Sequence, residues 1–259
     1  MCRLAAYIGP AISLRKFLLE PPHSLYRQAR EPQELLYTTL NADGYGFGWY
    51  SPGGTPSTYT NVLPIWSDSN LPSLARTLYG RLWIAEVRSA TEGNPVHQFN
   101  TQPFSDSALL FVHNGFIQDF HEQVRHGILQ QLAPAVTASI HGNTDSEYLF
   151  ACLRQVMLDN PQVQLPAAIS RLFELLRGLV GDRPALLNLV VTDGACLYAT
   201  RHGLNHESPS LYYTTSDPRY PDGQLVASER FSTHPSWQPV PEHHILALTP
   251  DRPPELQPI

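Results

Sequence analysis

Short strand-like runs recur along this sequence in groups, and they do not alternate regularly with helices. They are rich in Val, Ile, Leu and Tyr and end at turn-forming residues, as strands usually do. They cover residues 2–9, 44–50, 81–88, 107–115, 185–194, 195–201, 211–215, 224–230 and 243–250. Because successive parallel strands need a helical crossover between them, the grouping argues against a doubly wound parallel sheet. It favours two mainly antiparallel sheets with helices packed outside them.

Helical periodicity accounts for most of the sequence between these groups. The predicted helices cover residues 13–20, 33–40, 118–132, 144–160 and 164–179. Thr144, followed three residues later by Glu147, is a typical helix start. Asp193-Gly194 predicts the turn of a hairpin, and residues 51–59 predict a surface loop.

With 259 residues the chain is long enough to bury a substantial core. It shows neither an internal repeat nor a low-complexity linker. We therefore predict a single domain over residues 2–250, followed by a loose Pro-rich tail over residues 251–259.

Charge and hydropathy exclude two kinds of partner. The formal net charge is −6, and the 17 Lys and Arg residues are scattered, so the sequence offers no track for nucleic-acid phosphates. No apolar run approaches the roughly 18 residues of a membrane span, and no signal segment is evident. We expect a cytoplasmic protein that does not bind nucleic acid or membrane, and the sequence leaves its oligomeric state open.

The three cysteines show no metal-ligand or disulfide spacing. The His residues are dispersed, and neither the 121–126 segment nor the 243–244 pair has a plausible ligand set. We therefore expect no metal and no other cofactor. Cys152 and Cys196 are expected to be small buried residues.

Cys2 directly follows the initiator methionine. Removal of Met1 would leave a thiol, with an ordinary pKa near 8.5, and an α-amine, with one near 8, on the same residue. A nucleophile and a weak base would then lie side by side. Taken alone, Cys2 is equally the start of an ordinary buried strand.

Two segments carry side chains that can bind charged groups of a ligand. The strand that ends at Arg88 runs into small residues that include Thr91, so the guanidinium, with the Thr91 hydroxyl, is placed to bind a carboxylate. Asp145 lies at a helix start, where its carboxylate can bind an ammonium group. The alternatives are a surface ion pair for Arg88 and helix capping for Asp145.

A third segment carries two hydrogen-bond donors. An apolar strand leads into Asn114-Gly115, whose side-chain amide and backbone N–H can converge as an oxyanion hole. The alternative is a hairpin turn. Together with Cys2, Arg88 and Asp145, these donors suit a site that holds an α-amino acid by its head and attacks a carbonyl on its side chain.

These motifs, in this order, resemble those of the class II glutamine amidotransferases, which are N-terminal-nucleophile hydrolases. The resemblance implies a four-layer α/β/β/α sandwich. It also implies that Cys2 is the nucleophile with its α-amine as base, and that Asn114 and Gly115 form the oxyanion hole. Arg88 and Thr91 would then hold the α-carboxylate of a glutamyl group, and Asp145 its ammonium. The segment 41–50 would supply a pocket wall, with Gly46 and Gly48 allowing close backbone approach.

The resemblance extends along nearly the whole chain and is strongest to stand-alone members that act in ergothioneine biosynthesis. Those members release glutamate from γ-glutamyl-hercynylcysteine sulfoxide, so a small γ-glutamyl compound is the expected substrate. The alternatives are a glutaminase subunit of an amidotransferase, a γ-glutamyl dipeptide hydrolase of glutathione turnover, and a catalytically dead binding protein.

Two features depart from the family pattern. Gln102 stands where many relatives have His, so no role of that His is transferred. The amine mechanism also requires that Met1 be removed. The leaving amine is expected to meet aromatic side chains, for which Tyr45, Trp49, Trp66 and Tyr212 are the candidates.

Overall fold

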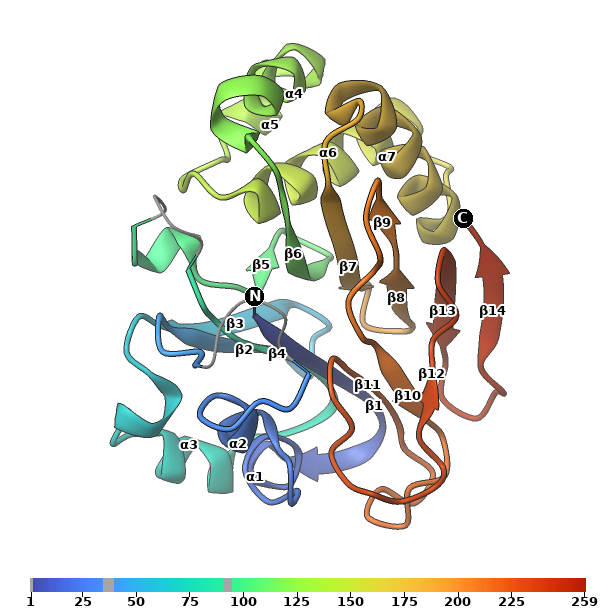
Figure 1. The fold of residues 1–259 in the computed structure, drawn as a ribbon. Coiled ribbons are helices and arrows are strands. Elements are labelled where there is room, and N and C mark those ends of the chain that lie inside the picture. The colour runs from blue at the N-terminus through green and yellow to red at the C-terminus, as the bar shows by residue number, and fades with distance from the viewer. Residues whose placement is uncertain (1, 35–39, 91–94) are drawn as a thin grey trace.

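The computed structural model describes residues 2–34, 40–90 and 95–259. Two sheets, in which every strand pair is antiparallel, stack face to face (Figure 1). The first sheet has the order β12-β10-β11-β1-β4-β2-β3. Its strands are β1 (Arg3–Ser13), β2 (Tyr45–Tyr50), β3 (Pro56–Asn61), β4 (Tyr79–Val87), β10 (Tyr212–Thr214), β11 (Gln224–Ala227) and β12 (Gln238–Pro239).

The second sheet has the order β14-β13-β8-β7-β6-β5, with β9 also paired to β7. Its strands are β5 (Phe104–Ser105), β6 (Leu110–Ile117), β7 (Ala185–Thr192), β8 (Leu197–Arg201), β9 (Gly203–Leu204), β13 (His244–Leu248) and β14 (Glu255–Pro258).

Helices cover the outer face of each sheet (Figure 1). The first sheet carries α1 (Leu14–Leu18), α2 (Leu25–Gln28), α3 (Leu71–Thr77) and the short turn η1 (Ile65–Ser67). The second carries α4 (Arg125–Gln131), α6 (Asp145–Asp159), α7 (Leu165–Val180) and the π-helical turn η3 (Phe120–Val124). The remaining turns are η2 (Gln98–Asn100) and α5 (Pro134–Thr137). The expected α/β/β/α layering is confirmed.

Side-chain alternation in the strands divides the core into three layers. In β1, Ala5 and Tyr7 pack toward α1–α3, whereas Leu4, Ala6 and Ile8 pack in the layer between the sheets. The third layer joins the second sheet to α6 and α7. Because successive strand residues point to opposite faces, the residue number decides which layer a side chain enters.

Two segments differ from expectation. Within the predicted surface loop, residues from Pro56 onward form β3, which pairs with β2. The end of the chain, expected to be loose, forms β14, which pairs with β13. Both are edge strands in the sheet order, and no residue of either is fully buried. Backbone pairing without burial leaves no alternating apolar pattern, which explains why both strands were missed.

Several local predictions are confirmed. Thr144 caps α6 by accepting a hydrogen bond from the Glu147 N–H. The segment around Gly194 closes the β7–β8 hairpin. Cys152 and Cys196 are buried. Most of the helix predicted over 33–40 lies outside the described residues.

Substitution of Gly46 tests how closely the backbone packs in this sandwich. A Cβ at this position would overlap the carbonyl oxygen of Gln102, whereas one at Gly178, on α7, would meet nothing within 4 Å. We expect Gly46→Ala to lower the free energy of unfolding by about 2 kcal/mol or more, because backbone must move to make room. Gly178→Ala should leave it unchanged or raise it by roughly 0.5–1 kcal/mol. Urea unfolding of both variants measures the difference, and equal effects would contradict the packing described.

Candidate active site

The layer between the sheets changes from apolar to polar at one end. Along the inter-sheet face of successive strands, an apolar residue is followed two positions later by a polar one. The pairs are Ile84 and Glu86 on β4, Val112 and Asn114 on β6, and Val226 and Ser228 at the end of β11. Cys2 occupies the corresponding position before Leu4 on β1. Side-chain alternation therefore brings these polar groups to one mouth of the sandwich.

Cys2 is partly buried at this mouth. Its thiol donates a weak hydrogen bond to the Ser89 carbonyl, with 3.7 Å between Sγ and the oxygen. Burial, and then the negative charge of Glu86, raise the pKa of the Cys2 thiol well above its ordinary value. The resting sulfur is therefore a thiol, and a nucleophilic attack by it requires a proton acceptor.

Glu86 is fully buried beside this thiol. Its Oε1 accepts a hydrogen bond from Gln102 Nε2 at 2.9 Å. Burial raises the pKa of Glu86 to about 7, although contacts with the Cys2 thiol, the charge of Arg88 and Gln102 act in the opposite direction. The carboxyl thus titrates near neutral pH.

Arg88 follows β4 and is only 4% exposed, so the alternative of a surface ion pair is wrong. Its guanidinium donates to the carbonyls of Asp43 and Pro95, each over a long 3.4 Å. Within residues 2–34, 40–90 and 95–259 it forms no ion pair. A buried guanidinium with such weak partners can still bind a carboxylate through two parallel hydrogen bonds.

Asn114 and Gly115 lie inside β6, so the alternative of a hairpin turn is also wrong. Asn114 Nδ2 donates to Ser228 Oγ at 3.1 Å, and the same hydroxyl accepts the Leu4 N–H at 3.0 Å. Ser228 therefore ties the Asn114 amide to the strand that begins beside Cys2. An amide nitrogen has two N–H bonds, so one remains for an oxyanion.

Asp145 begins α6 and is partly exposed. Its Oδ2 accepts the Ile117 N–H at 2.8 Å, which fixes the carboxylate at the end of the strand that carries Asn114. Thr144, one residue earlier, makes the helix cap. Asp145 also takes part in the helix start, because its Oδ1 accepts the Ser146 N–H at 2.8 Å. A carboxylate has about four lone-pair sites, so Asp145 retains acceptor capacity for an ammonium group.

A short chain of hydrogen bonds runs from Arg88 toward Asp145. Arg88 and Asn100 both donate to the Pro95 carbonyl. Asn100 Nδ2 also donates to Asn143 Oδ1 at 2.8 Å, and the Asn143 N–H returns a bond to Asn100 Oδ1 at 3.0 Å. Asn143 lies two residues before Asp145. These hydrogen bonds therefore tie both Arg88 and the start of α6 to the segment from Pro95 to Asn100.

The sequence of this chain matches the family described as glutamine amidotransferases class-II over residues 33–234. The chain belongs to the class II glutamine amidotransferases. It is 31% identical, over 95% of each chain, to a protein named gamma-glutamyl-hercynylcysteine sulfoxide hydrolase from Mycolicibacterium smegmatis.

Solved structures agree with this assignment. A glutamine aminotransferase class-II domain protein from Silicibacter pomeroyi is 27% identical, with a TM-score of 0.69 over 99% of each chain. A glutamine phosphoribosylpyrophosphate amidotransferase from B. subtilis has a TM-score of 0.67 at 14% identity, over 99% of this chain and 49% of that one. The second likeness concerns the fold alone, which is that of the N-terminal-nucleophile hydrolases.

The remaining predicted residues of this amidotransferase-type site are placed as follows. Gly46 pairs with Glu86 across β2 and β4, and it packs against the Gln102 backbone. Gly48 packs against Ile84 and Leu110 in the apolar inter-sheet layer. Thr91 lies outside the described residues. Of the aromatic candidates, Tyr45 is wholly buried in the core on the helix side of the first sheet.

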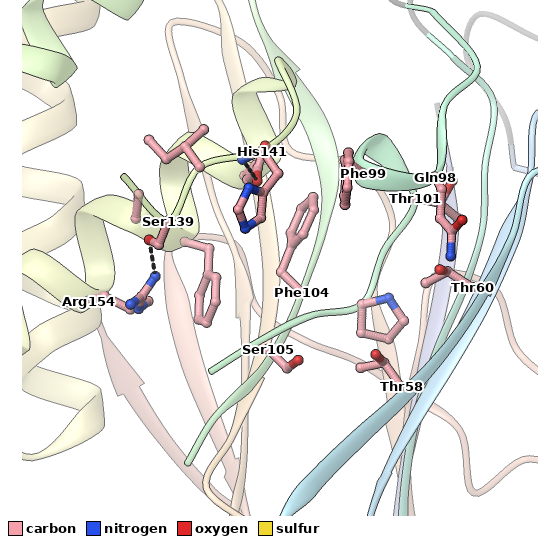
Figure 2. Close-up of a pocket in the computed structure, with 15 residues that line it drawn as sticks. Thr58, Thr60, Gln98, Phe99, Thr101, Phe104, Ser105, Ser139, His141 and Arg154 are labelled. Carbon is pink, nitrogen blue, oxygen red and sulfur yellow. Dashed lines mark hydrogen bonds between the residues drawn. The ribbon is translucent and has the colours of Figure 1, made fainter. Parts of the chain in front are cut away.

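A cavity of about 260 Å³ lies behind the segment that carries Gln102 (Figure 2). Thr101 and Pro103 line it, whereas Gln102 between them turns toward Glu86. Figure 2 shows its opposite wall, where Arg154 donates to Ser139. No predicted site residue lines this cavity, so it is separate from the mouth beside Cys2.

Sequence reasoning missed Glu86, Ser228 and Asn100. A signal for Glu86 was present, because a carboxylate follows Leu82 and Ile84 on the buried face of an apolar strand, and such charges are seldom buried without a reason. Ser228 and Asn100 lie in segments without a chemical signature of their own. Their roles depend on contacts across long stretches of sequence.

Residues 2–34, 40–90 and 95–259 contain no cluster of His, Cys, Asp and Glu suited to a metal ion. They also contain no helix long and apolar enough to cross a membrane.

The shifted pKa of Glu86 predicts a pH-dependent stability. The folded state raises this pKa from 4.5 to about 7, so between these values the folded chain holds a proton that the unfolded chain has lost. Burying Glu86 therefore destabilises the fold increasingly as pH rises through this window, by up to a few kcal/mol, on the order of 3. Glu86→Gln should be more stable than wild type at pH 8 and similar to it at pH 4, as measured by denaturant unfolding. A stability difference that does not change with pH would contradict the shift.

Proposed function

We propose that this protein is an amidohydrolase that cleaves the γ-glutamyl amide of γ-glutamyl-hercynylcysteine sulfoxide and releases glutamate. The observation that carries the proposal is the full-length similarity to the M. smegmatis hydrolase of that name. The geometry supports this chemistry. The Cys2 thiol, the Asn114 amide and the charged side chains of Arg88 and Asp145 lie around one mouth of the sandwich. All three cysteines are free, which suits the reducing cytoplasm that we expect for this enzyme.

The proposed reaction passes through a thioester. Arg88 binds the α-carboxylate of the glutamyl group and Asp145 its ammonium, which presents the side-chain carbonyl to Cys2. The sulfur attacks Cδ while Asn114 and the Gly115 N–H stabilise the oxyanion. The amine then leaves, and water hydrolyses the thioester. The family resemblance makes the α-amine of Cys2, freed by loss of Met1, the proton acceptor.

A second cavity could receive the leaving amine. It has a volume of about 660 Å³ and is lined by side chains of both charges, including Arg27, Arg230, Glu34 and Glu229. Glu229 also pairs with Arg3, the residue next to Cys2, at 3.3 Å. The cavity is thus linked to the start of β1 through this ion pair, and its mixed charges suit a leaving group that carries charged substituents.

Substrate preference tests the proposal. Purified enzyme, checked by intact mass for loss of Met1, should release glutamate from γ-glutamyl-hercynylcysteine sulfoxide with a kcat/KM at least tenfold above that for glutamine or a γ-glutamyl dipeptide. Equal or better use of glutamine would instead indicate a glutaminase subunit, and preference for the dipeptide would indicate a peptide hydrolase.

Removal of the thiol tests the nucleophile. Cys2→Ala should abolish turnover while leaving the unfolding midpoint close to that of wild type, because no sulfur remains to form the thioester. Cys196→Ala, which removes a thiol outside this mouth, is the matched control and should remain active. Substantial glutamate release by the Cys2 variant would contradict the assignment.

Replacement of the guanidinium tests the binding of the α-carboxylate. Arg88→Lys keeps the charge but loses the two parallel hydrogen bonds, so KM should rise roughly tenfold or more with a smaller change in kcat. Arg81→Lys, at an exposed position on the same strand, is the control and should leave both constants unchanged. An unchanged KM in the Arg88 variant would exclude this role.

A further inference from the structure

Arg3, the residue next to Cys2, has a completely buried side chain. Side-chain alternation in β1 directs it to the helix side of the first sheet, whereas Cys2 and Leu4 face the layer between the sheets. Its Nε donates to the Cys2 carbonyl at 2.8 Å, and its Nη1 donates to Glu229 Oε1 at 3.3 Å. One planar guanidinium therefore joins the main chain of the nucleophile to the Glu229 carboxylate.

The Glu229 carboxylate accepts three further hydrogen bonds. Its Oε1 accepts the Glu34 N–H at 3.0 Å, and its Oε2 accepts the Gln33 N–H at 2.9 Å and a bond from His23 Nε2 at 2.6 Å. With the contact to Arg3, each oxygen has two donors. Burial acts against the charged form, but the hydrogen bonds hold the pKa of Glu229 below its ordinary value. Glu229 is therefore ionised at neutral pH and fixed in one orientation.

The two residues after β11 hold the start of β1 on its second edge. β11 pairs with β1 only from Ala5 onward. Before that point, the Ser228 N–H donates to the Leu4 carbonyl at 2.9 Å, and Ser228 Oγ accepts the Leu4 N–H. Glu229 follows directly and reaches the Cys2 carbonyl through the buried guanidinium. Ser228 and Glu229 thus replace the regular strand pairing along the first residues of the chain.

Stability alone is a poor explanation for this arrangement. The cost of removing two charges from water offsets their attraction, and well-packed apolar residues often stabilise a fold as well as a buried ion pair does. What the pair adds is position. The Cys2 carbonyl and the Cys2 Cα lie in one peptide plane, so a bond that fixes the carbonyl also fixes the Cα. Both the thiol and the α-amine project from that atom.

We propose that Glu229 is a positioning residue for the nucleophile and acts through Arg3. This proposal rests on the proposed function, because it concerns the same thiol in the same reaction. Glu229 fixes the guanidinium, and the guanidinium fixes the Cys2 main chain. The thiol is thereby held within reach of the Cδ atom of a γ-glutamyl group bound by Arg88 and Asp145. Displacing a reacting atom by about 1 Å can cost on the order of 100-fold in rate, so the effect belongs to kcat.

The isosteric variant Glu229→Gln removes the charge that holds Arg3. We expect kcat to fall roughly 10- to 100-fold, with KM within about threefold of wild type, because neither residue binds the glutamyl group. The fall should be similar for γ-glutamyl-hercynylcysteine sulfoxide and for glutamine. This comparison is needed because Glu229 also lines the cavity of about 660 Å³. A side chain that only contacted the leaving amine would affect the sulfoxide substrate alone.

Inactivation of Cys2 gives a readout that does not require turnover. A chloromethyl ketone analogue of glutamine, with –CH2Cl in place of the amide –NH2, binds by its amino-acid head, and the Cys2 sulfur then displaces its chloride. In Glu229→Gln the maximal inactivation rate should fall roughly 10- to 100-fold, with an unchanged half-saturating concentration. Alkylation by iodoacetamide, which has no such head, should stay within about threefold of wild type. A loosened fold would instead expose Cys2 and accelerate this alkylation.

Arg3→Lys tests the other half of the connection and serves as a second variant should Glu229→Gln fail to fold. An ammonium group still neutralises Glu229, but it lacks the planar fork that donates to two partners at once. Its kcat should fall as in Glu229→Gln, and the double variant should lose no more than the worse single variant. Glu229→Asp, which keeps the charge, should recover part of the lost activity. Glu20→Gln, at an exposed ion pair with Arg15, is the matched control and should follow wild type.

Three results would overturn the proposal: kcat of folded Glu229→Gln or Arg3→Lys within about threefold of wild type, a loss confined to the sulfoxide substrate, or additive losses in the double variant. Failure of the proposed function would look different. Wild type would then prefer glutamine or a γ-glutamyl dipeptide, and the same variants assayed with that substrate would still decide the role of Glu229. A wild type that released no glutamate from any γ-glutamyl amide would overturn both proposals.

Discussion

The stacking of two antiparallel sheets is the constraint on which the rest of this structure depends. Once the sheets pack face to face, every second residue of each central strand must enter the layer between them. Leu4, Ile84 and Val112 fill that layer with apolar side chains. The same alternation, continued to the strand ends, leaves Cys2, Glu86 and Asn114 no other place than the mouth of the layer. The sandwich therefore places these three residues, whereas the segments around Pro95 and Asn143 position Arg88 and Asp145.

The interactions among the polar groups at this mouth depend on their partial burial away from water. Charges there are screened less than at the surface, so the charge of Glu86 raises the pKa of the Cys2 thiol and the charge of Arg88 opposes the rise in the pKa of Glu86. Exclusion of water also means that every buried polar group needs a partner. Gln102 supplies one for Glu86, and Ser228 supplies one for Asn114. Polar side chains without an obvious role in the sequence thus support those that carry the chemistry.

Much of the fold could be predicted because elements with a buried face carry apolar residues at a regular spacing. β4 and β7, buried along most of their length, and α7, with one apolar face, were recognised from that pattern alone. β3 and β14 were missed because backbone pairing at a sheet edge demands no apolar side chain. The same distinction applies to the site. Cys2, Arg88, Asn114 and Asp145 were recognisable because their motifs are local, whereas the bond from Asn114 to Ser228 joins residues 114 positions apart.

Chain ends usually fray, which would make an N-terminal side chain a poor place for reactive chemistry. β1 avoids this because it is a central strand, with β4 paired along one edge from Arg3 onward and β11 along the other from Ala5. The first residues are therefore held by backbone hydrogen bonds on both sides. Cys2 therefore loses its conformational entropy when the sheet forms and not when a ligand binds. A ligand that arrives later meets a thiol that is already immobilised.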